Sequence, residues 1–212
     1  MPPLKSFEVG HLRVFIEQDC DPQSPAEWDN VGEIVYTSLQ YTLGTRHVTH
    51  AQMDDIRRGI TSYKLIGMPV FAYVHGSAVI HAAESNPFDC PWDSGQSGFV
   101  FCTYERAIQE FPGQVEKVVR REALRTMITE VETFSQYLQG DVYGYRIMDG
   151  DNEVESCWGL YGLDYAIKEA KAAAETLCPS RMAHSSHVRG SLACTPMPVW
   201  KYGSHQRLEN ER

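Results

Sequence analysis

The stretch QVEKVVRREALRTMITEVETFSQYLQ, residues 114–139, contains the longest regular pattern in the sequence. Its apolar residues recur at steps of three and four, which is the spacing of one face of an amphipathic helix. Gly140 follows, at a position where glycine commonly ends a helix. We therefore expect a helix over 114–139 whose apolar face packs against a core. Its apolar residues are Val115, Val118, Val119, Leu124, Met127, Ile128, Val131, Phe134 and Leu138.

Strand patterns lie on both sides of this helix. Asp149-Gly150 between the apolar runs 142–148 and 154–161 is typical of a β-hairpin. Strand pairs interrupted by helices predict an α+β fold, with a mainly antiparallel sheet of about five to seven strands packed by one long helix and three shorter ones. The other expected strands cover 12–17, 32–43, 68–74, 78–82 and 99–102, and the shorter helices cover 49–58, 103–110 and 165–177.

Length and composition bear on domain organisation. A chain of 212 residues, with 42% hydrophobic and 22% charged residues, has globular composition and is long enough to form one domain with a core. We expect a single α+β domain over 1–178 and a polar, partly mobile C-terminal tail over 179–212. No apolar run approaches the roughly 18 residues that span a membrane, and the first residues lack the apolar core of a signal peptide. We therefore expect a soluble cytoplasmic protein with no membrane partner.

Charge and the absence of known motifs exclude several functions. A net charge of −9 disfavours direct binding to nucleic-acid phosphates, which needs concentrated lysine and arginine. The clearest basic cluster, Lys117, Arg120, Arg121 and Arg125, has the spacing of a solvated helix surface. The sequence contains no G-x-S-x-G, G-x-x-x-x-G-K-[ST], G-x-G-x-x-G or H-E-x-x-H motif. The commonest serine-hydrolase, nucleotide-binding and zinc-protease classes are therefore disfavoured.

A tryptophan-aspartate signature occurs twice, as Trp28-Asp29-Asn30-Val31-Gly32 and as Trp92-Asp93-Ser94-Gly95. Asp, Asn, Ser and Gly favour tight turns, because their short side chains bond nearby backbone and glycine accepts a positive φ. The preceding tryptophan can bury a large flat surface that holds such a turn against a core. We interpret the two acidic turns as candidate parts of one functional site.

Loop residues from several strands can contribute to that site. His75 beside Asp93 would form a general acid–base pair, with Ser94 as a nucleophile, which would make the protein a small hydrolase. Alternatively, Asp29 and Asp93 cap their own turns, the two tryptophans fill the core, and His75 bonds to a backbone carbonyl in a hairpin. The full set consists of Asp29, Asn30, His75, Asp93, Ser94 and Gln96.

The acidic loop 19–30 is a candidate metal site. Asp19 and Asp21, together with Asp29 and either Glu17 or Glu27, offer the oxygen ligands that calcium and magnesium prefer. The loop lacks the alternating ligands and central glycine of an EF-hand. We expect no cofactor, and keep calcium or magnesium at Asp19 and Asp21 as the alternative.

The hairpin 142–161 is rich in aromatic residues, among them Tyr143 and Trp158. Aromatic side chains flanked by arginine are typical of the residues that dominate protein–protein interfaces. They are also ordinary components of a sheet core, and the sequence leaves both interpretations open.

Several motifs occur together along the chain: WDNVG at 28–32, YVHGS at 73–77, PFDCPWDSGQSGF at 87–99, EVETFSQYLQGDVYGY at 130–145 and SCWGLYG at 156–162. This set resembles a family of uncharacterised proteins encoded by tailed bacteriophages and related mobile elements. The resemblance covers about residues 17–175. It implies a phage origin and assigns no catalytic residue.

A phage origin implies a protein that binds a host protein, and a bacterial immunity component is the expected target, as for anti-CRISPR or anti-restriction proteins. The alternatives are a small metal- or His-dependent hydrolase, or a non-catalytic binder, acting on a nucleotide or an immune signalling molecule. We favour a binding protein over an enzyme. The expected binding residues are Trp28, Asp29, Asn30, His75, Trp92, Asp93, Ser94, Gln96, Tyr143 and Trp158.

Overall fold

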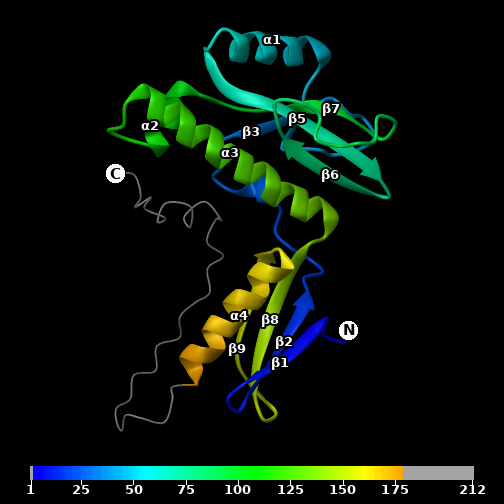
Figure 1. Ribbon diagram of the computed structural model, residues 1–212, viewed down its shortest axis with the longest axis vertical. Coiled ribbons are helices and arrows are strands. Elements are labelled where there is room, and N and C mark those ends of the chain that lie inside the picture. Colours follow the sequence, from blue (N-terminus) through cyan, green and yellow to red (C-terminus); the bar gives the residue numbers. More distant parts are fainter. Residues whose placement is uncertain (1, 179–212) are drawn as a thin grey trace, which may run out of the picture. The chain divides into compact units, whose positions relative to one another are not determined.

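The computed structural model describes residues 2–178 (Figure 1). These residues contain four α-helices, one of them long, and two mostly antiparallel sheets of four and five strands. The predicted α+β class is thus confirmed, with the strands shared between two sheets. The described residues form two compact units, whereas a single domain over 1–178 is predicted from the sequence. Unit 1 contains residues 2–23 and 140–178, and unit 2 contains residues 24–139. The predicted tail, 179–212, lies outside the described residues.

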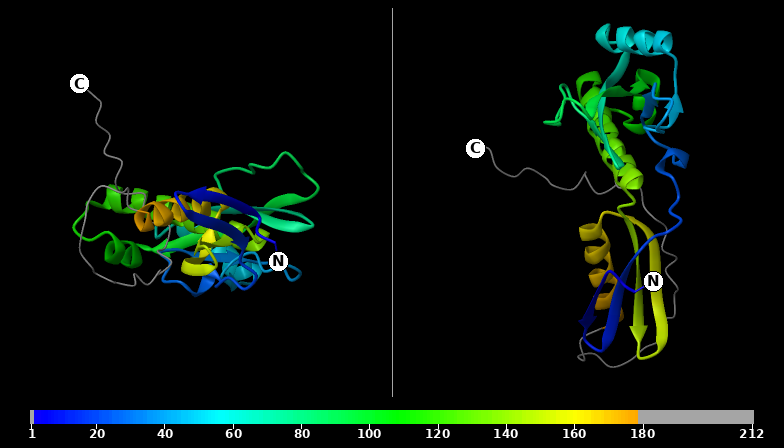
Figure 2. Two further views of the ribbon diagram at one scale, coloured as in Figure 1. Left: turned by 90° about the horizontal axis from the view of Figure 1, so that it is seen from below. Right: turned by 90° about the vertical axis from the view of Figure 1, so that its right-hand side faces the viewer.

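Unit 1 is a four-stranded antiparallel sheet with one helix on it. The strands β1 (Lys5–Val9), β2 (Leu12–Gln18), β8 (Val142–Asp149) and β9 (Asn152–Tyr161) are arranged in that order. Helix α4 (Leu163–Leu177) covers one face of the sheet (Figure 2). It buries Ala166, Ala170 and Ala174, which recur at four-residue steps and therefore share one side of the helix. The predicted hairpin is confirmed as β8 and β9.

Unit 2 is a five-stranded sheet in the order β4-β3-β7-β5-β6. Its central strand, β7, pairs antiparallel with β3 and β5, and only β3 and β4 pair in parallel. The strands are β3 (Glu33–Tyr36), β4 (Arg46–His47), β5 (Leu65–His75), β6 (Ser77–Ala82) and β7 (Ser94–Thr103), and the helices are α1 (His50–Thr61), α2 (Tyr104–Glu110) and α3 (Glu116–Gln139).

Two helices cover opposite faces of the unit 2 sheet. Val35 and Phe99 lie in a cluster with residues of α1, whereas their neighbours Ile34 and Val100 lie in the cluster of α3. Successive strand residues point to opposite faces, so α1 and α3 must lie on different sides (Figure 1). The apolar face predicted for 114–139 is confirmed at Val119, Met127, Val131 and Phe134, which are all buried, but Val115 precedes the helix and is 69% exposed.

Helix α3 also covers the edge of the sheet. Its buried Ser135 accepts a hydrogen bond through Oγ from the backbone N–H of Ile80, at 3.0 Å. Ile80 lies in β6, the edge strand, and its N–H is therefore satisfied by a side chain of the helix.

Some element boundaries differ from the predicted ones. Strand β7 begins at Ser94 rather than at residue 99, because its polar first half is paired with β5 in the register Tyr73–Ser94. Helix α1 continues through Gly59 to Thr61, three residues beyond the predicted end at residue 58. A Cβ on Gly59 would lie 2.7 Å from Leu65 Cδ1, so this glycine permits close packing of the helix on β5. Within residues 2–178, no helix has the length and hydrophobicity to cross a membrane.

Candidate functional site

The two tryptophan loops lie at opposite ends of strand β7. Asp93 immediately precedes the strand, whereas Thr103 ends it and begins α2, whose Arg106 contacts Asp29. Ten residues of strand span about 30 Å at roughly 3.3 Å per residue. The structure therefore divides the predicted six-residue site in two. Asp29 and Asn30 lie at one end, and His75, Asp93, Ser94 and Gln96 lie at the other.

The first loop is fixed by a buried carboxylate on α3. Glu130 is only 8% exposed. Its Oε1 accepts a hydrogen bond from the backbone N–H of Val31 at 2.7 Å, and its Oε2 accepts one from the N–H of Gly32 at 2.9 Å. Both oxygens of the carboxylate thus hold consecutive peptide groups of the Trp28–Gly32 loop. Hydrogen bonds to a charged group of this kind are among the stronger ones in proteins.

Burial makes Glu130 a group that titrates near neutrality. It raises the pKa of the Glu130 carboxyl from 4.5 to about 7, because the charged form loses its hydration. The N–H groups of Val31 and Gly32 and the charge of Arg106 lower this pKa, and Glu110 raises it. The desolvation outweighs the favourable hydrogen bonds.

Arg106 holds the same loop from the other side. Its Nη2 lies 3.0 Å from Asp29 Oδ1 and 3.2 Å from the carbonyl oxygen of Asn30. Asn30 in turn donates its Nδ2–H to the carbonyl of Pro25, at 2.8 Å. Asp29 therefore pairs with α2 rather than capping its own turn, and Asn30 is the residue that closes the turn locally.

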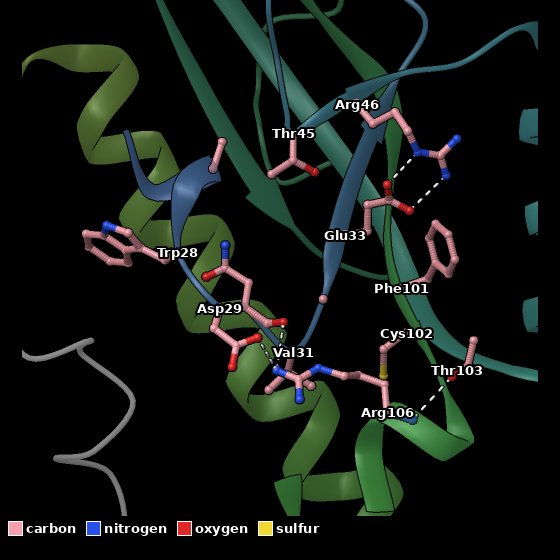
Figure 3. Close-up of a pocket in the computed structure, with 13 residues that line it drawn as sticks. Trp28, Asp29, Val31, Glu33, Thr45, Arg46, Phe101, Cys102, Thr103 and Arg106 are labelled. Carbon is pink, nitrogen blue, oxygen red and sulfur yellow. Dashed lines mark hydrogen bonds and ion pairs between the residues drawn. The ribbon is translucent and has the colours of Figure 1, made fainter. Parts of the chain in front are cut away.

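A pocket of about 550 Å³ opens beside this loop (Figure 3). Its polar lining contains two ion pairs, Arg106 with Asp29 and Arg46 with Glu33, so each guanidinium already has a carboxylate partner. Burial, followed by the charge of Glu130, raises the pKa of the Cys102 thiol to about 11. This thiol is protonated at neutral pH and is a poor nucleophile. The lining also includes Trp28, Thr45, Phe101 and Thr103.

The second loop is tied to the sheet by hydrogen bonds that leave its tryptophan exposed. Ser94 Oγ donates to the carbonyl of Cys90 at 2.6 Å and accepts from Nδ2 of Asn86 at 2.9 Å. The N–H of Val74 donates to the carbonyl of Asp93 at 2.9 Å. Trp92 is 93% exposed, so the alternative in which both tryptophans fill the core is wrong for this one. Trp28, in the first loop, is half-buried.

His75 and Asp93 form the pair predicted from the sequence. His75 Nδ1 lies 3.5 Å from Asp93 Oδ2, and the His75 side chain is 74% exposed. Its ring stacks on Tyr73, with ring centres 6.3 Å apart. The hydroxyl of Ser94 donates to the Cys90 carbonyl instead of to His75, an arrangement that does not activate it as a nucleophile.

The predicted metal ligands have structural contacts. Asp19 Oδ1 accepts a hydrogen bond from the N–H of Asp21, and its Oδ2 accepts one from the N–H of Gly159, both at 3.1 Å. Asp19 thus joins the end of β2 to β9. Among residues 2–178, no group of three or more His, Cys, Asp or Glu side chains is arranged to hold a metal ion.

Tyr143 and Trp158 belong to unit 1, so their environments are described separately. Tyr143 is half-buried against the core beneath α4, and burial, followed by Asp141, raises the pKa of its hydroxyl. Trp158 is 41% exposed, and its ring lies over Gly144 on the adjacent strand. A Cβ on Gly144 would lie 2.3 Å from this ring, so the indole packs against the backbone of Gly144 at a distance that leaves no room for a side chain.

Four residues of this site, Glu33, Arg46, Arg106 and Glu130, are not predicted from the sequence. No local signal marks them, because Glu130 is 98 and 99 positions from the peptide groups it binds, and Arg106 is 77 positions from Asp29. Comparisons of the chain with protein-family models, curated proteins and solved structures find no match. The resemblance to phage proteins therefore stays a prediction.

Proposed function

We propose that this chain is a phage-encoded accessory protein that binds and inhibits a host factor, of the anti-CRISPR or anti-restriction type, through the Trp92 loop. The observation that carries the proposal is the 93% exposure of Trp92 on a loop with defined anchors. Tryptophan is among the residues most enriched in the energetically dominant positions of protein interfaces. The phage origin comes from the sequence resemblance, and the binding role comes from this exposed side chain.

The anchoring of the loop supports a binding role. Ser94 and Asp93 connect it to β5 and to its own earlier residues through three hydrogen bonds. A loop that is already ordered loses less conformational freedom on binding, and more of its contact energy then appears as affinity. An exposed indole on such a loop is suited to insertion into a pocket of a partner.

An aromatic contact also joins the loop that carries Trp92 to β5. Tyr73 stacks on His75 and also contacts Phe88, with ring centres 5.8 Å apart. Phe88 lies in the same loop as Trp92, so its contact with Tyr73 is a further anchor of the loop on β5.

Affinity capture tests the proposal. Tagged wild-type protein is incubated with host lysate beside Trp92→Ala and a matched control, Leu39→Ala, which removes another exposed apolar side chain (90% exposed) from unit 2. We expect one stoichiometric partner with the wild type and with Leu39→Ala, and loss of that partner with Trp92→Ala. Equal capture by Trp92→Ala, or repeated empty captures by the wild type, would contradict the proposal.

The His75–Asp93 pair is the one observation that favours the second candidate, a His-dependent hydrolase. The purified protein is incubated with a nucleotide panel and divalent cations, and product is measured for the wild type and His75→Ala. Turnover that is abolished in His75→Ala while the melting temperature is unchanged would support the hydrolase. Absence of product in every reaction would remove it.

A further inference from the structure

The stretch of sequence that supplies the central strands of unit 2 contains no lysine or arginine. Between Lys64 and Arg106 the sequence has neither lysine nor arginine, although the chain has 19 of them. Strands β5, β6 and β7, with the segments that join them, are all drawn from this stretch. Three carboxylates, Glu84, Asp89 and Asp93, lie in the segment 83–93 between β6 and β7, which also carries Trp92.

These carboxylates are exposed, and among the described residues none of them has a lysine or arginine counterpart. Segment 83–93 loops out beyond the strands (Figure 2), and its three acidic residues are all exposed. Within residues 2–178, no ion pair joins any of them to a lysine or arginine, and Asp93 pairs only with His75. At the other tryptophan loop, by contrast, Asp29 and Glu33 each pair with an arginine.

We infer that the surface recognised by the Trp92 loop is basic, with lysine or arginine side chains around an apolar pocket that accepts the indole. The inference rests on the proposed function, since it names the chemistry of the partner of that same loop. Unneutralised charges around an apolar anchor attract a surface of opposite sign and repel an acidic one. The same charges disfavour nucleic acid as the ligand of this loop.

The indole of Trp92 and the carboxylates of the same loop contribute to binding in different ways. The Trp92 side chain would become buried on binding, and the apolar area that it contributes mainly determines the dissociation rate of the complex. Glu84 and Asp89 are exposed in the same segment, and exposed charges near an interface act mainly on the rate of encounter and on its dependence on salt. Removing the indole and removing the charges should thus have different kinetic signatures.

A peptide library tests the chemistry without a known partner. Random dodecapeptides displayed on filamentous phage are selected on the immobilised full chain, and enriched peptides are synthesised for binding kinetics. We expect enrichment of peptides in which lysine or arginine flanks an aromatic or aliphatic residue. For these peptides, Trp92→Ala should raise Kd by at least about tenfold, chiefly through faster dissociation.

The exposed charges are tested by a matched pair of double variants. Glu84→Gln/Asp89→Asn should slow association about three- to tenfold and reduce its salt dependence. The control Glu8→Gln/Glu132→Gln changes the net charge by the same amount at exposed positions outside the loop, and should leave the kinetics unchanged. Circular dichroism and melting curves establish that every variant is folded.

Three outcomes would overturn the inference: enriched peptides without lysine or arginine, equal binding to Trp92→Ala, or no enrichment. Its failure is distinguishable from that of the proposed function. Basic peptides that need Trp92, together with empty lysate captures, would retain the inferred chemistry and remove the host target. A captured host protein that needs Trp92, together with neutral or acidic library peptides, would retain the target and remove the inferred chemistry.

Discussion

The Trp28 loop and the Trp92 loop share a sequence signature and have opposite environments. In the first, Glu130 and Arg106 reach the loop from two helices and leave the tryptophan half-buried. In the second, the loop is tied to its own strand and to β5, and the tryptophan is exposed to solvent. The comparison teaches that the motif encodes a turn, whereas the side chains that reach it from distant elements decide whether that turn is structural or is available for binding.

The sharpest test of this difference is the removal of the Glu130 carboxylate. Glu130→Ala should lower the free energy of unfolding by about 2–4 kcal/mol, because two buried N–H groups lose their acceptor. Glu132→Ala, at an exposed position two residues along the same helix, should change it by less than about 0.5 kcal/mol. Urea titrations of both variants measure the difference, and equal stabilities would show that the carboxylate does not hold the loop.

The pH dependence of stability should report the same carboxylate. The pKa of Glu130 is about 7 in the folded protein and near 4.5 in the unfolded chain, so the folded state binds the extra proton between these values. Stability contributed by this group is therefore fully present below about pH 4.5 and is lost as the pH rises to 7. The expected loss is about 1–3 kcal/mol.

Glu130→Gln isolates this contribution. Urea titrations at pH 5 and pH 8 should show a smaller decrease for the variant than for the wild type, since an amide does not titrate. An identical pH dependence in the two proteins would mean that other groups account for it.

Each loop also has one glycine suited to a matched test. A Cβ on Gly32 would lie 2.6 Å from Met127 Cγ and 2.9 Å from Val100 Cγ2, whereas one on Gly95 would meet nothing within 4 Å. Gly32→Ala should therefore cost about 1–3 kcal/mol through overpacking, and Gly95→Ala less than about 0.5 kcal/mol. Thermal unfolding of the two variants makes the measurement, and a reversed order would contradict the packing described for the first loop.

The smallest effect on stability is expected at the exposed indole. Trp92→Ala should change the free energy of unfolding by less than about 0.5 kcal/mol, because the side chain is already in water. Trp28→Ala should cost about 1–2 kcal/mol for its half-buried ring. Chemical denaturation compares the two, and a large loss with Trp92→Ala would assign that residue a structural role.

The sequence predicts the periodic elements and fails where distant residues meet. The buried face of α3 and the β8–β9 hairpin follow from local spacing, because 3.6-residue periodicity and an Asp-Gly turn are local signals. The predicted start of strand β7, residue 99, is five residues too late. The preceding residues Ser94-Gly95-Gln96-Ser97 have no alternation of apolar and polar side chains, and they are extended because they pair with β5. Glu130 resembles a surface residue in the sequence, and only the tertiary structure places it against Val31 and Gly32.

The contact between Ser135 and Ile80 has a consequence for how other chains can approach unit 2. Strand β6 has no charged residue or proline, features that commonly prevent an edge strand from adding to a neighbouring molecule's sheet. The Ser135 hydroxyl of α3 accepts the hydrogen bond of the Ile80 N–H within β6. This N–H cannot then donate to a strand of another molecule, so the row of hydrogen bonds needed for intermolecular strand addition is interrupted. Unit 2 thereby gains protection against aggregation at β6, and recognition must use protruding side chains there rather than extension of the ladder.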